Sequence, residues 1–322
     1  MPHFNLALIG FGNVNRCLVE LLERKRAELE AGYDVTFSIT GVYSRRLGFL
    51  VDANGLSTTA LLDGTLTTPR STTLSDWLDS SAANVLIEAS SLDPFTGQPA
   101  IDHVRAALER GMHVVTANKG PIVHAAQDLE RLARHAGVKF RYEATFMGGC
   151  PIYSVLRECL PAAKLLRFRG LPNATTTMIL EAMEEGLSFD EGVKRAQEFG
   201  IAETDPSFDV DGWDSVVKLL GLANTVMGGH LKLEDVERSG IRDLEPSVVR
   251  AAKLEGTPIR LVATLERVGE TLRAKVAPER LQRSDSLSSI RGSDMIAGLN
   301  STCCPPWKSC LEARARWKQG MT

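Results

Sequence analysis

The sequence predicts an α/β protein in two parts, a doubly wound, Rossmann-like domain followed by an α+β domain. Three observations support this prediction. A glycine-rich turn stands between a strand pattern and a helix pattern at the very start of the chain. Strand and helix patterns then alternate as far as about residue 145. The length of 322 residues suits two domains, each with its own hydrophobic core.

The glycine turn has the form of a dinucleotide fingerprint. Gly10 permits a tight turn after the apolar run Leu-Ala-Leu-Ile, and Gly12 lets the backbone approach a pyrophosphate. Helical spacing begins at Arg16, directly after the turn, and the pyrophosphate would sit on the N-terminus of this helix. Asn15 replaces the third glycine of the fingerprint, so we expect the helix to pack on the strand in a looser or different way.

The alternation that follows is typical of a parallel sheet with helices on its faces. The expected strands cover residues 35–43, 84–89, 113–116 and 138–142. The expected helices cover residues 98–110 and 121–136.

Two arginines follow the second expected strand, at the place where this class of fold binds the ribose of the cofactor. The segment Tyr-Ser-Arg45-Arg46 has no acidic residue to accept a ribose 2′-hydroxyl. Arginines suit a 2′-phosphate, which favours NADP over NAD and leaves NAD possible. A solvated turn is an equally weighted interpretation of the same two residues.

Polar residues also follow three later strands, where ligands of open α/β sheets gather. They are Ser90 and Ser91, then Thr116 and Lys119, then Glu143 with the loop Gly148-Gly149-Cys150-Pro151. Lys119 precedes a helix that starts with proline, which is an unusual place for a lysine that only faces solvent.

The segment 203–218 concentrates charge more than any other part of the chain. Asp214 and Lys218 are four residues apart, so they share a helical face. A lysine held beside carboxylates and shielded from water can accept a proton from a reacting group. The alternative is structural: Asp211 caps the helix, and Asp214 and Lys218 form an ordinary surface ion pair.

Composition limits the classes of partner. The chain is 43% hydrophobic and 24% charged with a net charge of −3, which gives no reason to expect nucleic acid or acidic lipid as a partner. The apolar N-terminal run is too short to span a membrane and lacks the features of a signal peptide. We expect a cytoplasmic protein, and reduced thiols for its six irregularly spaced cysteines.

Five motifs in order together resemble the homoserine dehydrogenase family, over residues 5–295. They are Gly10-Phe-Gly-Asn-Val, Thr116-Ala-Asn-Lys-Gly-Pro, Glu143-Ala-Thr, Gly170-Leu-Pro-Asn173-Ala-Thr175, and Asp209-Val-Asp-Gly-Trp-Asp214-Ser-Val-Val-Lys218. The resemblance implies the short, monofunctional form of the enzyme, without a regulatory domain.

The resemblance also implies site residues. Lys218, Asp214 and Lys119 match the catalytic positions, and Glu203, Asp209, Asn173 and Thr175 match the substrate-binding positions. The implied cofactor positions are Gly10, Gly12, Asn13, Val14, Arg45, Arg46, Ser90, Ser91, Thr116 and Lys119. Glu143 and the backbone of Phe146, Gly148 and Cys150 match the loop where the family holds a monovalent cation such as sodium; a hinge carboxylate is the alternative for Glu143.

The activity implied is the interconversion of L-homoserine and L-aspartate 4-semialdehyde with NADP, in threonine and methionine biosynthesis. The implied domains are residues 1–145, to which 290–322 return, and a catalytic and dimerisation domain at 146–289. Its sheet of strands 164–170, 258–266 and 271–276, backed by helices 188–199 and 211–228, would form a homodimer interface.

The end of the chain departs from the family pattern, because no glycine-rich loop follows Asn300. The segment suits a divergent surface tail, a disrupted reading frame, or, least well, a metal site of Cys303, Cys304 and Cys310. It leaves two alternative functions open. One is a dehydrogenase for another amino-acid alcohol or aldehyde, and the other is a catalytically impaired NADP-binding paralogue.

Overall fold

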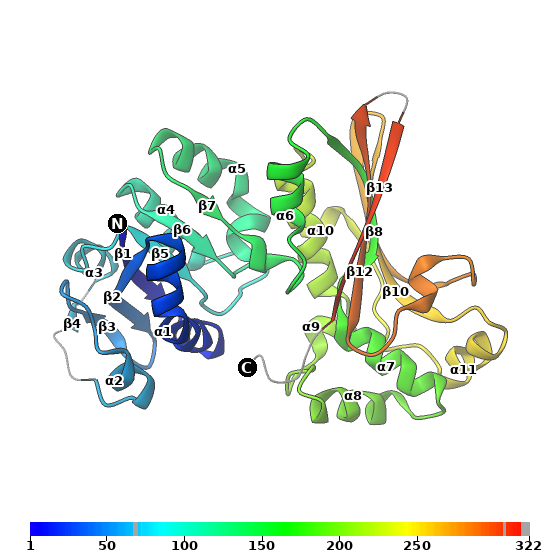
Figure 1. The fold of residues 1–322 in the computed structure, drawn as a ribbon. Helices are drawn as coiled ribbons and strands as arrows, with labels where there is room; N and C mark the ends of the chain where they lie inside the picture. Colours follow the sequence, from blue (N-terminus) through cyan, green and yellow to red (C-terminus); the bar gives the residue numbers. More distant parts are fainter. Residues whose placement is uncertain (67–69, 72, 305–306, 317–322) are drawn as a thin grey trace. The chain divides into compact units, whose positions relative to one another are not determined.

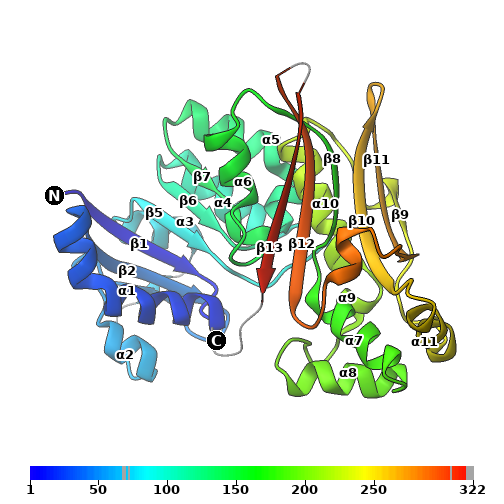
Figure 2. The same ribbon diagram turned by 45° about the vertical axis from the view of Figure 1, so that its right-hand side comes forward.

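A computed structural model describes residues 1–66, 70–71, 73–304 and 307–316, with only the backbone described at 70–71, 303–304, 307–312 and 316. The chain forms two compact units, Met1–Thr145 and a second that begins at Phe146. Each unit has its own sheet (Figures 1 and 2). In the described part of the chain, no helix is both long enough and apolar enough to cross a bilayer.

The first unit is a seven-stranded sheet with the order β4-β3-β2-β1-β5-β6-β7. Its strands are β1 (His3–Ile9), β2 (Thr36–Ser44), β3 (Gly48–Val51), β4 (Arg70–Ser71), β5 (Val85–Glu88), β6 (His113–Thr116) and β7 (Phe140–Arg141). β1, β2, β5, β6 and β7 run parallel, while β3 and β4 form an antiparallel edge that the sequence did not predict.

Helices cover both faces of this sheet, which confirms the doubly wound prediction (Figures 1 and 2). They are α1 (Asn13–Tyr33), α2 (Thr58–Asp63), α3 (Leu74–Ser80), α4 (Ala100–Glu109) and α5 (Gly120–His135), followed by a 3₁₀ turn at Glu143–Thr145. The chain reverses direction across the sheet at β1, which pairs with β2 on one side and β5 on the other. Ligands of such sheets bind at this switch point, outside the carboxyl ends of the strands.

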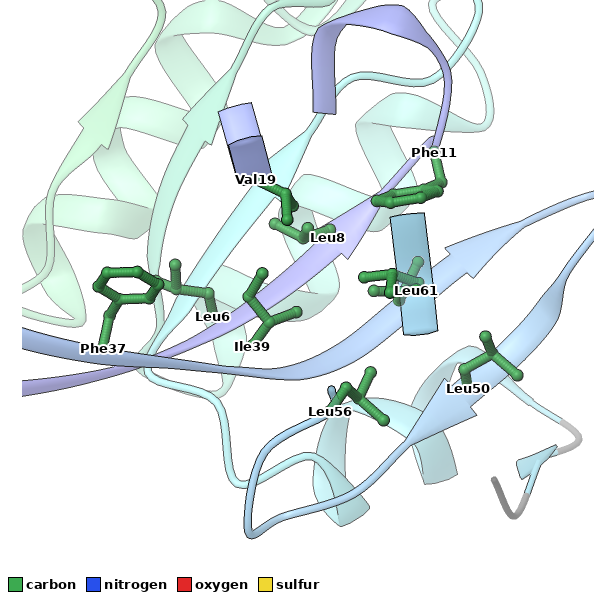
Figure 3. Packing of buried hydrophobic residues seen from close by; sticks show 10 residues of the cluster. Leu6, Leu8, Phe11, Val19, Phe37, Ile39, Leu50, Leu56 and Leu61 are labelled. Carbon is green, nitrogen blue, oxygen red and sulfur yellow. The ribbon is translucent and has the colours of Figure 1, made fainter. Parts of the chain in front are cut away.

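Apolar side chains that alternate along the strands build the core beneath α1. Leu6 and Leu8 of β1 point to the same face as Ile39 of β2, and they meet Val19 of α1 there (Figure 3). Phe11 lies beside Leu8 at the end of the turn and is also buried. This packing fixes the start of α1 against the end of β1, which positions the glycine turn.

The second unit is a six-stranded sheet with the order β13-β12-β8-β10-β11-β9. Its strands are β8 (Lys164–Leu171), β9 (Val236–Arg238), β10 (Ile259–Val268), β11 (Thr271–Arg280), β12 (Asp294–Cys304) and β13 (Trp307–Arg316). The predicted strands at 164–170, 258–266 and 271–276 are therefore confirmed as β8, β10 and β11.

Helices α7, α10 and α11 pack against β10, and α8 packs on α7. The helices of this unit are α6 (Ile152–Ser154), α7 (Ala174–Glu184), α8 (Phe189–Glu198), α9 (Ser207–Val210), α10 (Trp213–Thr225) and α11 (Pro246–Leu254). A π-helical turn at Val155–Cys159 and 3₁₀ turns at Leu233–Asp235 and Ser286–Ser289 complete it. The predicted helix 188–199 is confirmed as α8, and the predicted helix 211–228 is confirmed as α10, which is shorter at both ends; α9 precedes it and was not predicted.

The end of the chain differs from the expectation that residues 290–322 return to the first unit. β12 pairs with β8 and β13 pairs with β12, so residues 294–316 extend the second sheet (Figures 1 and 2). Gly170 explains the close pairing, because a Cβ there would lie 2.3 Å from the carbonyl oxygen of Ile296. The side chains of Cys303, Cys304 and Cys310 lie outside the described part of the structure.

A buried ion pair ties α7 to β10. Arg260 is fully buried, and its Nη1 lies 2.7 Å from Oε1 of Glu184, whose side chain is 4% exposed. Lys253 contacts the other oxygen of Glu184 at 2.9 Å. A buried charge that loses its partner is strongly destabilising, so this pair constrains the helix that carries part of the site described below.

We predict that Glu184→Ala lowers the free energy of unfolding by about 3–5 kcal/mol, because Arg260 keeps its charge without a buried partner. The neighbouring Glu185→Ala is the control: Glu185 pairs with Arg195 at the surface, and its loss should cost under about 1 kcal/mol. Urea unfolding of the three proteins measures both values. Equal losses in the two variants would show that the buried pair contributes no more than the exposed one.

Candidate active site

The glycine turn of the first unit leaves the N-terminus of α1 open. Gly10 has φ 79°, and a Cβ on it would lie 2.3 Å from the carbonyl oxygen of Ala89, so β1 and β5 can approach only with glycine there. Gly12 caps α1 without a side-chain hydrogen bond, and a Cβ on it would meet nothing within 4 Å. This open helix start fits the pyrophosphate of a dinucleotide.

Asn15 takes the place of the fingerprint's third glycine in a specific way. Its side chain is buried, and its Nδ2 donates to the carbonyl oxygens of Ile9 at 3.1 Å and Gly10 at 2.7 Å. The helix is therefore not packed loosely. The amide ties the first turn of α1 to the end of β1, which is the different arrangement that the sequence left open.

A cavity of about 680 Å³ opens at the switch point of the sheet. Six of the predicted cofactor residues line it, namely Gly10, Gly12, Arg45, Arg46, Ser90 and Ser91. Asn13 and Val14 begin α1 and are exposed. The structure thus brings the glycine turn, the arginines after β2 and the serines after β5 to one cavity.

A buried carboxylate that the sequence analysis missed organises the strand ends around this cavity. Glu88, the last residue of β5, accepts hydrogen bonds from the backbone N–H of Ser90 at 3.0 Å and the Thr116 hydroxyl at 2.9 Å. The Ser90 hydroxyl donates to it as well. Asn118 then links the loops, donating to the carbonyl oxygens of Ser90 at 3.1 Å and Ser91 at 3.3 Å. The only signal in the sequence was an acidic residue at the end of an apolar strand.

Lys119 lies at the start of α5, directly after this network. It occupies the N-cap position and is half-buried. The predicted Thr116 does not line the cavity and instead hydrogen-bonds Glu88 and Asn118, and Lys119 belongs to the same strand-end region of the first unit.

The second unit brings two acids, an amide and a lysine together. Asn173 follows β8 and caps α7, accepting a hydrogen bond from the backbone N–H of Thr176 at 2.9 Å. Its Nδ2 donates to Oδ1 of Asp209 at 2.7 Å and to Oδ2 of Asp214 at 2.9 Å. Lys218 contacts the same Asp214 oxygen at 2.7 Å.

The Asp214–Lys218 pair is buried, so it is not an ordinary surface pair. The two side chains are 10% and 11% exposed. The lysine Nζ also donates to the carbonyl oxygen of Pro172 at 2.5 Å. The structural alternative of an Asp211 cap does not hold either, because Gly212 caps α10 with φ 85°. The predicted neighbours are therefore held in a shielded position, as proton transfer would require.

Asp209 carries an unusual charge balance. Burial raises the pKa of its carboxyl, and repulsion from Asp214 raises it further, to about 6. The hydrogen bond from Asn173 and the charge of Lys218 act in the opposite direction. Near neutral pH this carboxyl therefore changes charge readily.

Thr175 also belongs to this cluster, whereas Glu203 does not. Thr175 is buried in the first turn of α7, its hydroxyl contacts the carbonyl oxygen of Ile201 at 3.3 Å, and its side-chain hydrogen bond with Asp209 lowers the pKa of that carboxyl. Glu203 is exposed, and its backbone carbonyl accepts from Gln197 at 3.0 Å. No described hydrogen bond joins Glu203 to the acid pair.

The residues predicted to hold a cation lie where the first unit ends and the second begins. Glu143 belongs to the 3₁₀ turn that ends the first unit, while Phe146 and Cys150 are buried in the second unit. Gly148 is exposed, and the backbone N–H of Cys150 donates to the carbonyl oxygen of Met147 at 3.2 Å. Among the described residues, no group of three or more His, Cys, Asp or Glu side chains could hold a metal ion. The sodium site stays a prediction.

We predict that Asp209→Asn makes the protein more stable above pH 6. The native carboxyl has a pKa raised from 3.8 to about 6, so ionising it costs stability as pH rises between these values, and the cost is complete above pH 6. Asparagine avoids that cost. The free energy of unfolding should exceed that of the wild type by about 1–3 kcal/mol at pH 7.5, and the gain should disappear near pH 4.

Urea unfolding at a series of pH values measures this difference. Asp205→Asn is the control, because Asp205 is exposed and the hydroxyl of Ser207 lowers the pKa of its carboxyl. A gain that does not change with pH, or a loss at pH 7.5, would contradict the account.

Comparisons with known proteins cover both units. Residues 10–143 match the family described as "Homoserine dehydrogenase, NAD binding domain", and residues 151–308 match "Homoserine dehydrogenase". An NAD(+)-dependent homoserine dehydrogenase of Pseudomonas canavaninivorans is 34% identical over 94% of this chain and 88% of its own. The homoserine dehydrogenase of Methanocaldococcus jannaschii is 32% identical over 81% of this chain and 80% of its own.

A solved structure agrees with these sequence matches. It is a hyperthermophilic archaeal homoserine dehydrogenase mutant in complex with NADPH, and it shares 26% identity and a TM-score of 0.80, covering 99% of this chain and 93% of its own. The fingerprint turn, the buried lysine–carboxylate pair and the matches across both units confirm the resemblance seen in the sequence. This chain belongs to the homoserine dehydrogenase family of NAD(P)-dependent oxidoreductases.

Proposed function

We propose that this protein interconverts L-homoserine and L-aspartate 4-semialdehyde, in threonine and methionine biosynthesis, with NADP as its preferred cofactor. NAD remains a possible second cofactor. The observation that carries the reaction is the shielded cluster of Asn173, Asp209, Asp214 and Lys218. A nicotinamide cofactor, when bound, supplies the hydride acceptor or donor.

Lys218 is the proposed proton-transfer residue. In the direction of alcohol oxidation its neutral amine takes the hydroxyl proton, and in the direction of aldehyde reduction its ammonium form protonates the forming alkoxide. Asp214 and the Pro172 carbonyl hold Nζ from two sides, so the group is oriented before substrate arrives. This preorganisation is what a general base needs besides a suitable pKa.

Asp209 is the proposed partner of the substrate ammonium. A half-buried carboxylate beside Asn173 would be stabilised by an incoming cation, which offsets its repulsion from Asp214. Asn173 and Thr175 are proposed to line the same substrate position, with Glu203 as an outer acid. Lys119 is proposed to act on the cofactor and substrate from the first unit.

The preference for NADP rests on Arg45 and Arg46. Both are exposed in the turn after β2 and line the cavity of the glycine turn, where a 2′-phosphate would be paired by guanidinium groups. The related structure in complex with NADPH agrees with this preference, whereas the relative from Pseudomonas canavaninivorans is named NAD(+)-dependent.

A homodimer and a cytoplasmic location complete the proposal. The second sheet has a hollow of about 780 Å³ lined by residues of both charge signs, including Arg169, which pairs with Glu279 at 2.8 Å. A two-fold dimer interface brings the same surface of both subunits together, and a surface that carries both charge signs can pair with its own copy. No disulfide involves Cys17, Cys150 or Cys159 among the described residues, and reduced thiols are what the proposed cytoplasmic location requires. A monovalent cation near Glu143 is part of the proposal, and nucleic acid and membrane partners are not.

Turnover of L-homoserine tests the proposed reaction. We expect the purified protein to reduce NADP⁺ at mildly alkaline pH, followed at 340 nm, and Lys218→Ala to lower kcat by about 10²–10⁴-fold through loss of proton transfer. Lys232→Ala, a change at an exposed lysine, is the control and should leave kcat unchanged. Lys218→Ala should still bind the cofactor, because Lys218 lies in the second unit and the glycine turn in the first. The proposed reaction would be rejected if the wild-type protein binds the cofactor but oxidises only another amino-acid alcohol, or no alcohol at all.

Cofactor preference has a separate test. Arg45→Ala and Arg46→Ala together should raise the KM for NADP⁺ by about tenfold or more and leave the KM for NAD⁺ within about twofold, because only the 2′-phosphate loses its partners. Arg24→Ala, an exposed change on α1, serves as the control. Equal effects on both cofactors would assign the arginines to a solvated turn.

A further inference from the structure

The nucleotide cavity contains a histidine that has no part in the function described above. His103 lies on α4 and lines the cavity together with Gly10 and Gly12. Its side chain is 9% exposed, and its Nδ1 is buried with no hydrogen-bond partner among the described residues. A buried polar nitrogen without a partner is costly, so its position calls for a physical reason.

The neighbour of this nitrogen is a buried carboxylate. Nδ1 of His103 lies 3.9 Å from Oε1 of Glu88, and the Glu88 side chain is fully buried. Glu88 already accepts hydrogen bonds from Ser90 and Thr116, all of which suit its charged form. A carboxylate held by these donors therefore lies beside the His103 side chain that lines the cavity, and a neutral imidazole would leave it without a cation beside it.

Binding of a dinucleotide adds to the negative charge near Glu88, because the diphosphate brings two negative charges into the cavity. Repulsion between the diphosphate and Glu88 would oppose binding in a site shielded from water. A positive charge on the His103 imidazole would offset this repulsion.

We propose that His103 is a cofactor-binding residue that takes up one proton from solvent when the dinucleotide binds, and holds it against Glu88. The proposal rests on NAD(P) binding as proposed above and assigns its proton linkage to one side chain. Linkage is reciprocal, so a proton that binds with the cofactor also tightens the cofactor as pH falls.

The other charged groups of the cavity leave the assignment clear. Tyr43 of β2 lines the cavity and meets the His103 ring edge-on at 6.2 Å between centroids. Arg45 and Arg46 stay charged at all relevant pH values. The Thr96 hydroxyl and neighbouring backbone N–H groups lower the pKa of Asp93, which therefore stays ionised. Among the described residues that line this cavity, His103 is the one histidine.

Calorimetric titration in two buffers of different ionisation enthalpy, such as PIPES and Tris, measures the protons taken up on binding. NAD⁺ is the clean probe, because its diphosphate does not titrate near neutral pH, whereas the phosphomonoester of NADP⁺ does. With either cofactor, the difference between wild type and His103→Gln removes the ligand's own contribution.

We expect the wild type to take up protons near pH 7, to at most one per bound cofactor, and His103→Gln to take up none beyond the ligand's share. Its affinity should fall about tenfold relative to wild type at pH 6 and by much less at pH 9. His135→Gln, an exposed histidine of α5, should behave as wild type.

Three outcomes would overturn the proposal: binding by the wild type without proton uptake, unchanged uptake in His103→Gln, or equal loss of affinity at both pH values. The wild-type measurement alone decides the first, even if the variant fails to fold. Binding without proton uptake rejects the role of His103 and leaves the proposed function standing, whereas absence of any binding rejects the proposed function itself.

Discussion

One amide side chain fixes the charged centre of the second unit. Asn173 accepts from the start of α7 and donates both Nδ2 hydrogens, one to Asp209 and one to Asp214. Burial raises the pKa of the Asp209 carboxyl, and repulsion from the nearby Asp214 carboxylate raises it further. The amide and Lys218 make the arrangement tolerable. The buried pair of Glu184 and Arg260 holds the far end of the same helix.

The first unit uses the same principle with a different residue. Glu88 is a buried acid whose hydrogen bonds join the loops after β5 and β6, so the serines and Lys119 lie on an ordered strand-end platform. Both units therefore build their sites around a buried carboxylate that accepts several hydrogen bonds. Buried carboxylates of this kind lower the stability of the fold but hold their neighbours in a defined geometry, as is common at functional sites.

The features of the site that depend on residues close together in the sequence could be predicted. The contact of Asp214 with Lys218 follows from their spacing on one helix turn, and the cavity at Gly10 and Gly12 follows from a strand–turn–helix pattern. The contact of Asn173 with Asp214 spans 41 positions and depends on how β8 and α10 pack, so spacing could not predict it. The pairing of Glu88 with His103 was missed for the same reason.

The end of the chain shows the same limit more plainly. Its pairing with β8 is decided by the free edge of that strand and by the small Gly170, neither of which is visible within residues 294–316 themselves. An expectation built on the family pattern placed this segment in the first unit. The buried Ile296, Ala297 and Leu299 place it in the second sheet instead.

Rescue by a small amine tests most directly whether an amine at position 218 transfers the proton. Methylamine added to Lys218→Ala should restore homoserine oxidation in proportion to the concentration of its neutral form, since the lost group is then supplied from solution. Lys119→Ala should show no such response. Wild-type turnover in Lys218→Ala without amine, or rescue of Lys119→Ala alone, would contradict the account and move proton transfer to the first unit.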